Sequence, residues 1–167
     1  MSQYKKIHAI LETLQIPFDE ITHEASMSCE HSKVLRQEAG LVWVGSKNIV
    51  FHAKGNFYLL TTLWDKDIKA RKFKKEFGTK DIRFASQEEI TTLWLGTIGS
   101  IAPFWFENIS IPVYVDSEIF QYEFFIFNPA DPTKSLRIST QDLKKVYENM
   151  KNNVKIFTLT EEEVSFV

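Results

Sequence analysis

The chain has 167 residues, of which 44% are hydrophobic and 25% are charged, and its formal net charge is −2. A chain of this length most simply forms one domain, and it buries enough surface to need no metal or disulfide. The single cysteine, Cys29, excludes an intramolecular disulfide and a cysteine-rich zinc site. Because the net charge is slightly negative, binding to a nucleic acid would require a local basic patch.

Targeting and membrane signals are missing from the sequence. The first ten residues are too polar for a signal peptide, and no apolar run approaches the 18 residues of a membrane helix. We therefore expect a cytoplasmic protein that contacts neither a membrane nor DNA.

The first half of the chain is predicted to contain a helix, a strand, a second helix and a β-hairpin, at residues 3–15, 18–21, 28–39, and 49–53 with 57–63. Pro17 follows the first helix and Gly40 the second, as helix ends require. A tight turn at Lys54 and Gly55 joins the two hairpin strands.

The second half is predicted to contain two helices, two strands and a last helix, at residues 65–77, 86–95, 111–115, 124–127 and 139–150. Gly78 ends the helix at 65–77, and Ser86 and Glu89 form a capping box for the next. The last helix is capped by Ser139 or Thr140. A further strand and an acidic stretch, 161–163, follow.

Helices and strands alternate without a strict βαβ rhythm, which indicates an α+β or mixed α/β fold. We expect one domain at residues 1–150 and a C-terminal extension of unknown role at residues 151–167.

Lys47 is the first candidate for chemistry. It follows Gly45 and Ser46 and directly precedes the apolar run 49–51, so it lies at the predicted mouth of a strand. A fixed positive charge in a partly desolvated cleft can hold a phosphate or orient a carbonyl ester. A solvated loop lysine fits the same local sequence.

A second candidate is the loop made of Gly99, Ser100, Ile101, Ala102 and Pro103. Gly99 permits a positive φ, and Pro103 stiffens the far end. The N–H groups between them could bind a carbonyl oxygen. An ordinary loop leading into a buried strand at 104–106 is the alternative.

The histidines suggest neither a metal site nor a catalytic triad. None of the four lies at metal-ligand spacing from another, and no nucleophile or phosphate-loop motif occurs. We therefore expect no metal and no cofactor. His23 and Glu24 form a polar pair that is either structural or catalytic.

Basic residues concentrate in the predicted helix 65–77, at Lys66, Lys69, Arg71, Lys72, Lys74 and Lys75. A solvated helix face and a landing site for an RNA backbone both fit this pattern. Lys69, Lys72 and Lys75 are the candidates for backbone contact, and charge reversal at Lys72 and Lys75 is expected to weaken RNA binding and its salt dependence.

Seven segments, in this order, resemble the YbaK/prolyl-tRNA editing domain family of aminoacyl-tRNA deacylases. The resemblance spans residues 5–148, and its pieces are His23-Glu24 to Met27-Ser28, Lys47 to Val50, Phe84 to Ser86, Gly99 to Phe104, Val113 to Asp116, Phe127 to Pro129, and Leu136 to Ser139. The Lys47-Asn48 pair is more similar to the free-standing Ala-tRNA(Pro) deacylase branch than to the Cys-tRNA(Pro) branch.

The resemblance implies a fold and a reaction. The fold is a mixed α/β domain with a curved, largely antiparallel central sheet flanked by helices. The reaction is hydrolysis of the ester between an amino acid and the terminal ribose of a mischarged tRNA, by a positioned water and without a cofactor. Prolyl-tRNA synthetase is a further possible partner.

The resemblance also implies roles for individual residues. Lys47 would engage the terminal adenosine or its ester, Asn48 would shape the site, and the loop from Gly99 to Pro103 would hold the aminoacyl end. His23, Ser28 and Asn128 complete the expected substrate-binding set. Asn128 departs from the histidine that is common in the alanine-specific branch, which leaves the amino acid open.

Two alternatives remain. The first is a module that binds aminoacyl-tRNA or a synthetase without hydrolysing it, and the second is a hydrolase of another small ester or amide. Retention of Lys47 favours catalysis, and the basic segment at 65–77 favours an RNA-sized substrate.

Overall fold

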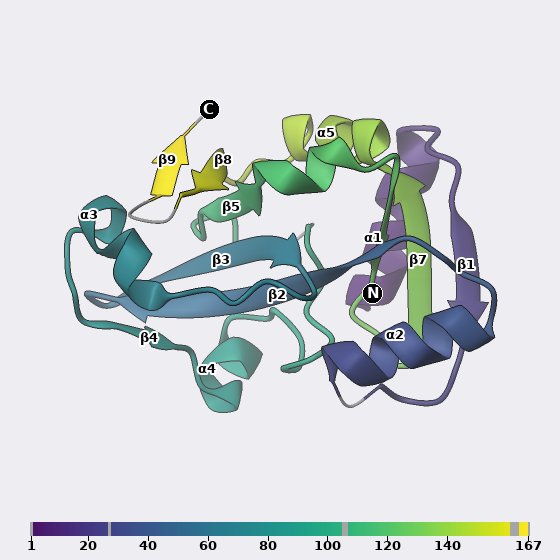
Figure 1. The fold of residues 1–167 in the computed structure, drawn as a ribbon, viewed down its shortest axis with the longest axis horizontal. Helices are drawn as coiled ribbons and strands as arrows, with labels where there is room; N and C mark the ends of the chain where they lie inside the picture. The colour runs from purple at the N-terminus through teal and green to yellow at the C-terminus, as the bar shows by residue number, and fades with distance from the viewer. Residues whose placement is uncertain (1, 27, 105–106, 161–163, 167) are drawn as a thin grey trace.

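The computed structural model describes residues 2–26, 28–104, 107–160 and 164–166. Within them, nine strands form one sheet in the order β1-β7-β6-β2-β3-β5-β8-β9, and β4 also pairs with β2 (Figure 1). The strands are β1 (Asp19–Thr22), β2 (Val44–Ala53), β3 (Asn56–Leu63), β4 (Ile82–Phe84), β5 (Val113–Asp116), β6 (Phe124–Phe127), β7 (Lys134–Ser139), β8 (Val154–Leu159) and β9 (Val164–Phe166).

Helices flank the sheet, which confirms the mixed α/β class. They are α1 (Gln3–Thr13), α2 (Cys29–Glu38), the short 3₁₀ helix η1 (Ala70–Phe73), α3 (Lys74–Phe77), α4 (Gln87–Thr92), the 3₁₀ helix η2 (Ser117–Gln121) and α5 (Thr140–Glu148). Ser86 and Glu89 form the predicted capping box of α4, and Ser139 caps α5. No helix in the described ranges is long and apolar enough to cross a membrane.

The expectation of a largely antiparallel sheet is wrong, because the sheet is mixed. Strands β2 and β6, β3 and β5, and β5 and β8 pair in parallel. Parallel neighbours need long crossover connections. The chain supplies one between β3 and β5, where η1, α3, β4 and α4 intervene.

Strands β2 and β3 form the predicted hairpin. Lys54 and Gly55 have φ values of 50° and 75°, which are the two left-handed residues of a tight hairpin turn. Strand β2 begins at Val44, earlier than predicted, so Lys47 lies inside the strand and pairs with Thr62. The early start of β2 also brings it alongside β6.

The predicted helix 65–77 is wrong in its first part, because helical structure begins only at residue 70. Lys69 has extended backbone angles, φ −94° and ψ 114°. Ile68 is buried in the core and the Lys66 side chain is ion-paired with Asp116, so tertiary contacts hold this stretch outside a helix. The predicted end is confirmed, because Gly78 is left-handed with φ 71°.

Two apolar clusters cover opposite faces of the sheet. Successive residues of one strand belong to different clusters, as Val50 and Phe51 show on β2. Phe157 on β8 is fully buried in the second cluster, so the C-terminal segment contributes to the core. Phe104 is also buried, whereas residues 105–106 and the acidic stretch 161–163 lie outside the described residues.

Candidate active site

A cavity of about 300 Å³ lies where α2, β2, the loop after α4 and the end of β6 meet. Its lining combines hydroxyl, amide and cationic groups with aliphatic side chains, and consists of Ser28, Ser32, Arg36, Ser46, Lys47, Asn48, Ile49, Ile98, Gly99, Ile101 and Asn128. Ligand sites commonly combine an apolar lining with a few convergent polar groups in this way.

Six of the predicted site residues meet at this cavity, namely Ser28, Lys47, Asn48, Gly99, Ile101 and Asn128. Ser28 caps α2 with its hydroxyl, which accepts the N–H of His31 at 3.1 Å. Sequence reasoning missed the remaining lining residues. A buried polar position on α2 has no distinctive local pattern, so Ser32 and Arg36 could not be identified before the fold was known.

Lys47 borders the cavity, and its ammonium is already engaged by the protein. Its Nζ donates to the carbonyl oxygen of Lys66 at 2.9 Å. On β2, Lys47 lies opposite Thr62 and Asn48 opposite Thr61, so the two side chains leave the strand on different faces. The Lys47 ammonium is therefore held at a defined place on one side of the sheet.

Lys66 itself is fixed by acidic neighbours. Its Nζ lies 2.6 Å from Asp116, which is almost fully buried, and 2.5 Å from Glu118. Burial favours a lower pKa for Lys66, but the hydrogen bonds and charges of these two carboxylates outweigh it and raise the pKa above its ordinary value. Lys66 stays charged at neutral pH, and this anchors the backbone that holds Lys47.

Asn48 ties the predicted loop to β2. Its Nδ2 donates to the Ile101 carbonyl oxygen at 2.8 Å and to Ser46 Oγ at 3.2 Å. Its Oδ1 accepts from Thr61 at 2.8 Å. Both ends of the amide are thus used by the protein, so Asn48 shapes the cavity.

The loop from Gly99 to Pro103 divides into cavity-lining and supporting residues. Gly99, with φ 91°, and Ile101 line the cavity. Ser100 is buried and donates its N–H and its hydroxyl to the Thr97 carbonyl, at 2.8 and 3.2 Å. Ala102 and Pro103 are buried, and the Pro103 carbonyl accepts the Tyr147 hydroxyl at 3.0 Å. Ser100, Ala102 and Pro103 therefore support the loop from behind.

Asn128 places a buried hydrogen-bond donor at the cavity. It follows β6, is 5% exposed, and accepts the Asp131 N–H with Oδ1 at 3.0 Å. This bond fixes the orientation of the amide, because a flipped amide would place its NH₂ group, a donor, against the Asp131 N–H, which is also a donor. Its Nδ2 has no partner among the described residues. A buried unpaired donor costs about 1–3 kcal/mol, so an acceptor oxygen that reached Nδ2 would be bound favourably.

The family model of the aminoacyl-tRNA editing domain matches residues 24–146. The chain belongs to this family. The matched span includes every residue that lines the cavity. The family expected from the sequence is thus confirmed, and the cavity is the candidate active site of this editing domain.

Solved structures share the fold of the editing domain. One is a candidate trans-editing enzyme for prolyl tRNA synthetase, with 18% identity, a TM-score of 0.71, and coverage of 92% of this chain and 95% of that chain. A hypothetical protein has 14% identity, a TM-score of 0.73, and coverage of 95% and 98%. A chain from a study of epitope grafting onto scaffolds has 17% identity, a TM-score of 0.72, and coverage of 92% and 95%. These identities establish likeness of fold only. No curated protein matches the chain significantly in sequence.

His23 is not among the residues that line the active-site cavity of the editing domain. Its Nδ1 is 2.7 Å from the Glu24 carbonyl, which can only accept, so Nδ1 carries the proton. In the neutral ring Nε2 then accepts from the Ser135 hydroxyl at 2.9 Å. Ser135 in turn accepts Arg36 Nε at 2.9 Å. His23 is therefore a positioning residue for Arg36.

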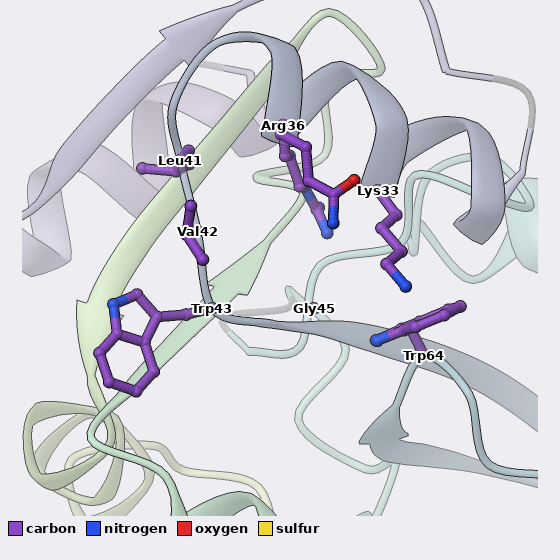
Figure 2. A pocket seen from close by; sticks show the side chains of 8 residues that line it. Lys33, Arg36, Leu41, Val42, Trp43, Gly45 and Trp64 are labelled. Atoms are coloured by element: carbon purple, nitrogen blue, oxygen red, sulfur yellow. The ribbon is translucent and has the colours of Figure 1, made fainter.

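Gly45 makes room for Arg36. A Cβ atom at Gly45 would lie 2.5 Å from Nη1 of Arg36. The guanidinium therefore packs directly over the Gly45 backbone, and Figure 2 shows Arg36 extending from α2 toward this point. A side chain at this position would force the Arg36 guanidinium to shift, and no positive φ is involved.

Two of the three predicted RNA-binding lysines, Lys72 on η1 and Lys75 on α3, lie on elements that do not line the cavity of the editing domain. Figure 1 shows α3 and α2 at opposite ends of the long axis. Lys69 pairs with Asp67 at 2.5 Å, and Lys72 donates to the Thr160 carbonyl at 2.6 Å. Lys75 is exposed on α3.

Across the described ranges, no three histidine, cysteine, aspartate or glutamate side chains are grouped to hold a metal.

Proposed function

We propose that this editing domain is a deacylase that hydrolyses the ester of a mischarged tRNA in trans. The proposed substrate is tRNA(Pro) carrying alanine or another small amino acid, and prolyl-tRNA synthetase is the proposed partner. The observation that carries the proposal is the buried, unpaired Nδ2 of Asn128, a residue that lines a small polar cavity bordered by Lys47. Membership of the aminoacyl-tRNA editing family supports it.

The size of the cavity supports a small aminoacyl group. Its volume of about 300 Å³ is at the lower end of ligand sites. Ile101 narrows it, and the bond from Asn48 to the Ile101 carbonyl keeps the loop in place. A synthetase distinguishes amino acids that differ by one methylene by only about 1–3 kcal/mol, so separate hydrolysis of small mischarged residues is needed.

The proposed chemistry is attack of water on the ester carbonyl carbon. The carbon–oxygen bond to the ribose breaks, the ribose oxygen takes a proton, and a free amino acid and an uncharged tRNA result. The Nδ2 of Asn128 donates to an oxygen of the aminoacyl group. The ammonium of Lys47 supplies positive charge at the cavity border, where the developing negative charge on oxygen needs it.

A non-catalytic module that binds aminoacyl-tRNA or a synthetase is the second candidate. The observation that favours it is the hydrogen bond from Lys47 Nζ to the Lys66 carbonyl, since a lysine with a structural partner could be retained without catalysis. Hydrolysis of a different small ester or amide is a weaker third candidate.

A deacylation panel tests the proposal. The purified chain is incubated with Ala-, Cys-, Ser-, Thr- and Pro-tRNA(Pro), and with cognate Ala-, Ser- and Thr-tRNA as controls. We expect the fastest hydrolysis for a small mischarged residue on tRNA(Pro). Binding of these RNAs with no hydrolysis of any of them would support the non-catalytic module instead.

A further inference from the structure

A second hollow, of about 50 Å³, adjoins the active-site cavity and shares Arg36 with it. We call it the tryptophan groove, and it is lined by Lys33, Arg36, Gln37, Leu41, Val42, Trp43, Gly45 and Trp64. Figure 2 shows Lys33 and Arg36 extending from α2 toward β2, with Trp43 and Trp64 on either side of Gly45. Arg36 is therefore the residue at which the two hollows meet.

The groove is a local positive site in a chain whose net charge is −2. Two cations line it and none of the lining residues is acidic. The Lys33 ammonium lies 4.0 Å from the centroid of the Trp64 ring, and the Arg36 guanidinium is buried and held by Ser135. Guanidinium and ammonium groups placed together in this way are typical of phosphate recognition.

The aromatic side of the groove is presented to solvent. Trp43 is 43% exposed although its ring contacts Phe124 at a centroid distance of 5.3 Å, and Val42 next to it is 63% exposed. The φ of Trp43 is 148°, a costly backbone angle for a bulky residue. Such an outlier suggests a functional position. Exposed aromatic rings beside cations are the composition of sites that bind single-stranded nucleic acid.

We propose that the tryptophan groove binds the single-stranded 3′ end of the tRNA, directly before its aminoacylated terminal nucleotide. A phosphodiester lies between Lys33 and Arg36, since the hollow suits a group of that size, and the adjoining base stacks on Trp43. This inference rests on the proposed function, because the cavity must hold the aminoacyl end. It gives the RNA a contact surface beside the site, whereas α3, which carries Lys75 and follows the 3₁₀ helix of Lys72, lies at the other end of the long axis (Figure 1).

The test compares a full substrate with a truncated one. KM and kcat are measured for alanyl-tRNA(Pro) and for alanyl-adenosine, which lacks the preceding phosphate and base. Lys33→Glu is expected to raise KM for the tRNA about tenfold more than KM for the adenosine ester, and to reduce the salt slope by about 0.7 for one lost phosphate. Trp43→Ala is expected to weaken tRNA binding about fivefold or more.

Two controls complete the design. Lys151→Glu makes the same charge change at an exposed lysine outside the groove, and is expected to leave both KM values unchanged. Binding of an amide-linked, non-hydrolysable alanyl RNA ending in the tRNA 3′ sequence separates the two proposals. No hydrolysis by the wild type would overturn the proposed function, while Lys33-dependent binding of this RNA would still support the groove.

Three results would overturn the proposal that the tryptophan groove binds RNA. The first is equal tRNA affinity for wild type and Lys33→Glu. The second is an equal rise of both KM values, because Lys33 would then act inside the cavity. The third is a loss of affinity in Lys151→Glu as large as in Lys33→Glu, since it would reflect overall charge.

Discussion

Two groups of cations in this editing domain differ in what the fold places around them. The residues Lys69, Lys72 and Lys75 are close in sequence, yet the first two are engaged by Asp67 and by the Thr160 carbonyl. Lys33 and Arg36 are an unremarkable pair in the sequence of α2, yet they meet two tryptophans beside the cavity. Clustering of charge along the chain does not show which charges converge in space, because the fold decides that.

The two regions also differ in how their cations are held. Arg36 is buried and fixed by Ser135, which His23 orients in turn. Lys69 and Asp67 are largely exposed, where ion pairs contribute little and are screened by salt. We therefore expect changes around α2 and β2 to affect function more strongly than changes on η1 and α3.

The largest effect is expected from Lys47→Ala. Loss of the ammonium at the cavity border should lower kcat for deacylation at least about 100-fold, as removal of a group that stabilises developing charge does. Thermal unfolding should match the wild type, with Lys54→Ala at the exposed hairpin turn as the control. Full deacylation by a correctly folded Lys47→Ala protein would remove Lys47 from the mechanism.

Asn128→Asp is expected to lower kcat/KM about tenfold or more. The variant keeps an oxygen for the Asp131 N–H and replaces the unpaired donor with another oxygen, so an acceptor on the aminoacyl group loses its partner. Steady-state deacylation of alanyl-tRNA(Pro) measures the effect. Unchanged kinetics would show that the Asn128 amide does not contact the substrate.

Gly45→Ala is expected to weaken tRNA binding and to lower the free energy of unfolding by about 1 kcal/mol. The new Cβ would displace the Arg36 guanidinium, and overpacking of this kind is destabilising. Denaturant unfolding and RNA binding are measured together, also in an Arg36→Met background. If displacement of Arg36 causes the loss of stability and binding, Gly45→Ala should have little further effect in the Arg36→Met background. An equally large further effect in that background would show that the new Cβ clashes with another group.

The smallest effect is expected from charge reversal of Lys72 and Lys75 together. The loss of long-range attraction should weaken tRNA binding about two- to threefold and reduce its salt dependence slightly. Both effects should be smaller than those of Lys33→Glu alone. Affinity measured between low and moderate salt makes this comparison. A larger loss than in Lys33→Glu would move the main RNA surface to η1 and α3.

Much of the local structure was predictable from the sequence. Ser86 with Glu89 marked the capping box of α4, Lys54 with Gly55 marked the hairpin turn, and Gly78 marked a helix end. These signals act within a few residues, so they survive without knowledge of the fold. The helix start was misjudged at residues 65–69 because Ile68 and Lys66 are held by distant parts of the chain.

The sequence by itself determined the family and the segments that carry the candidate site, with Lys47, Asn48, Gly99, Ile101 and Asn128 among them. Only the tertiary structure decided what each of them does. It showed that Asn48 is used in holding the loop, that Asn128 keeps an unpaired donor, and that Arg36 joins the cavity to a tryptophan groove. Hydrogen-bond partners and burial depend on segments far apart in the chain, and short patterns do not encode them.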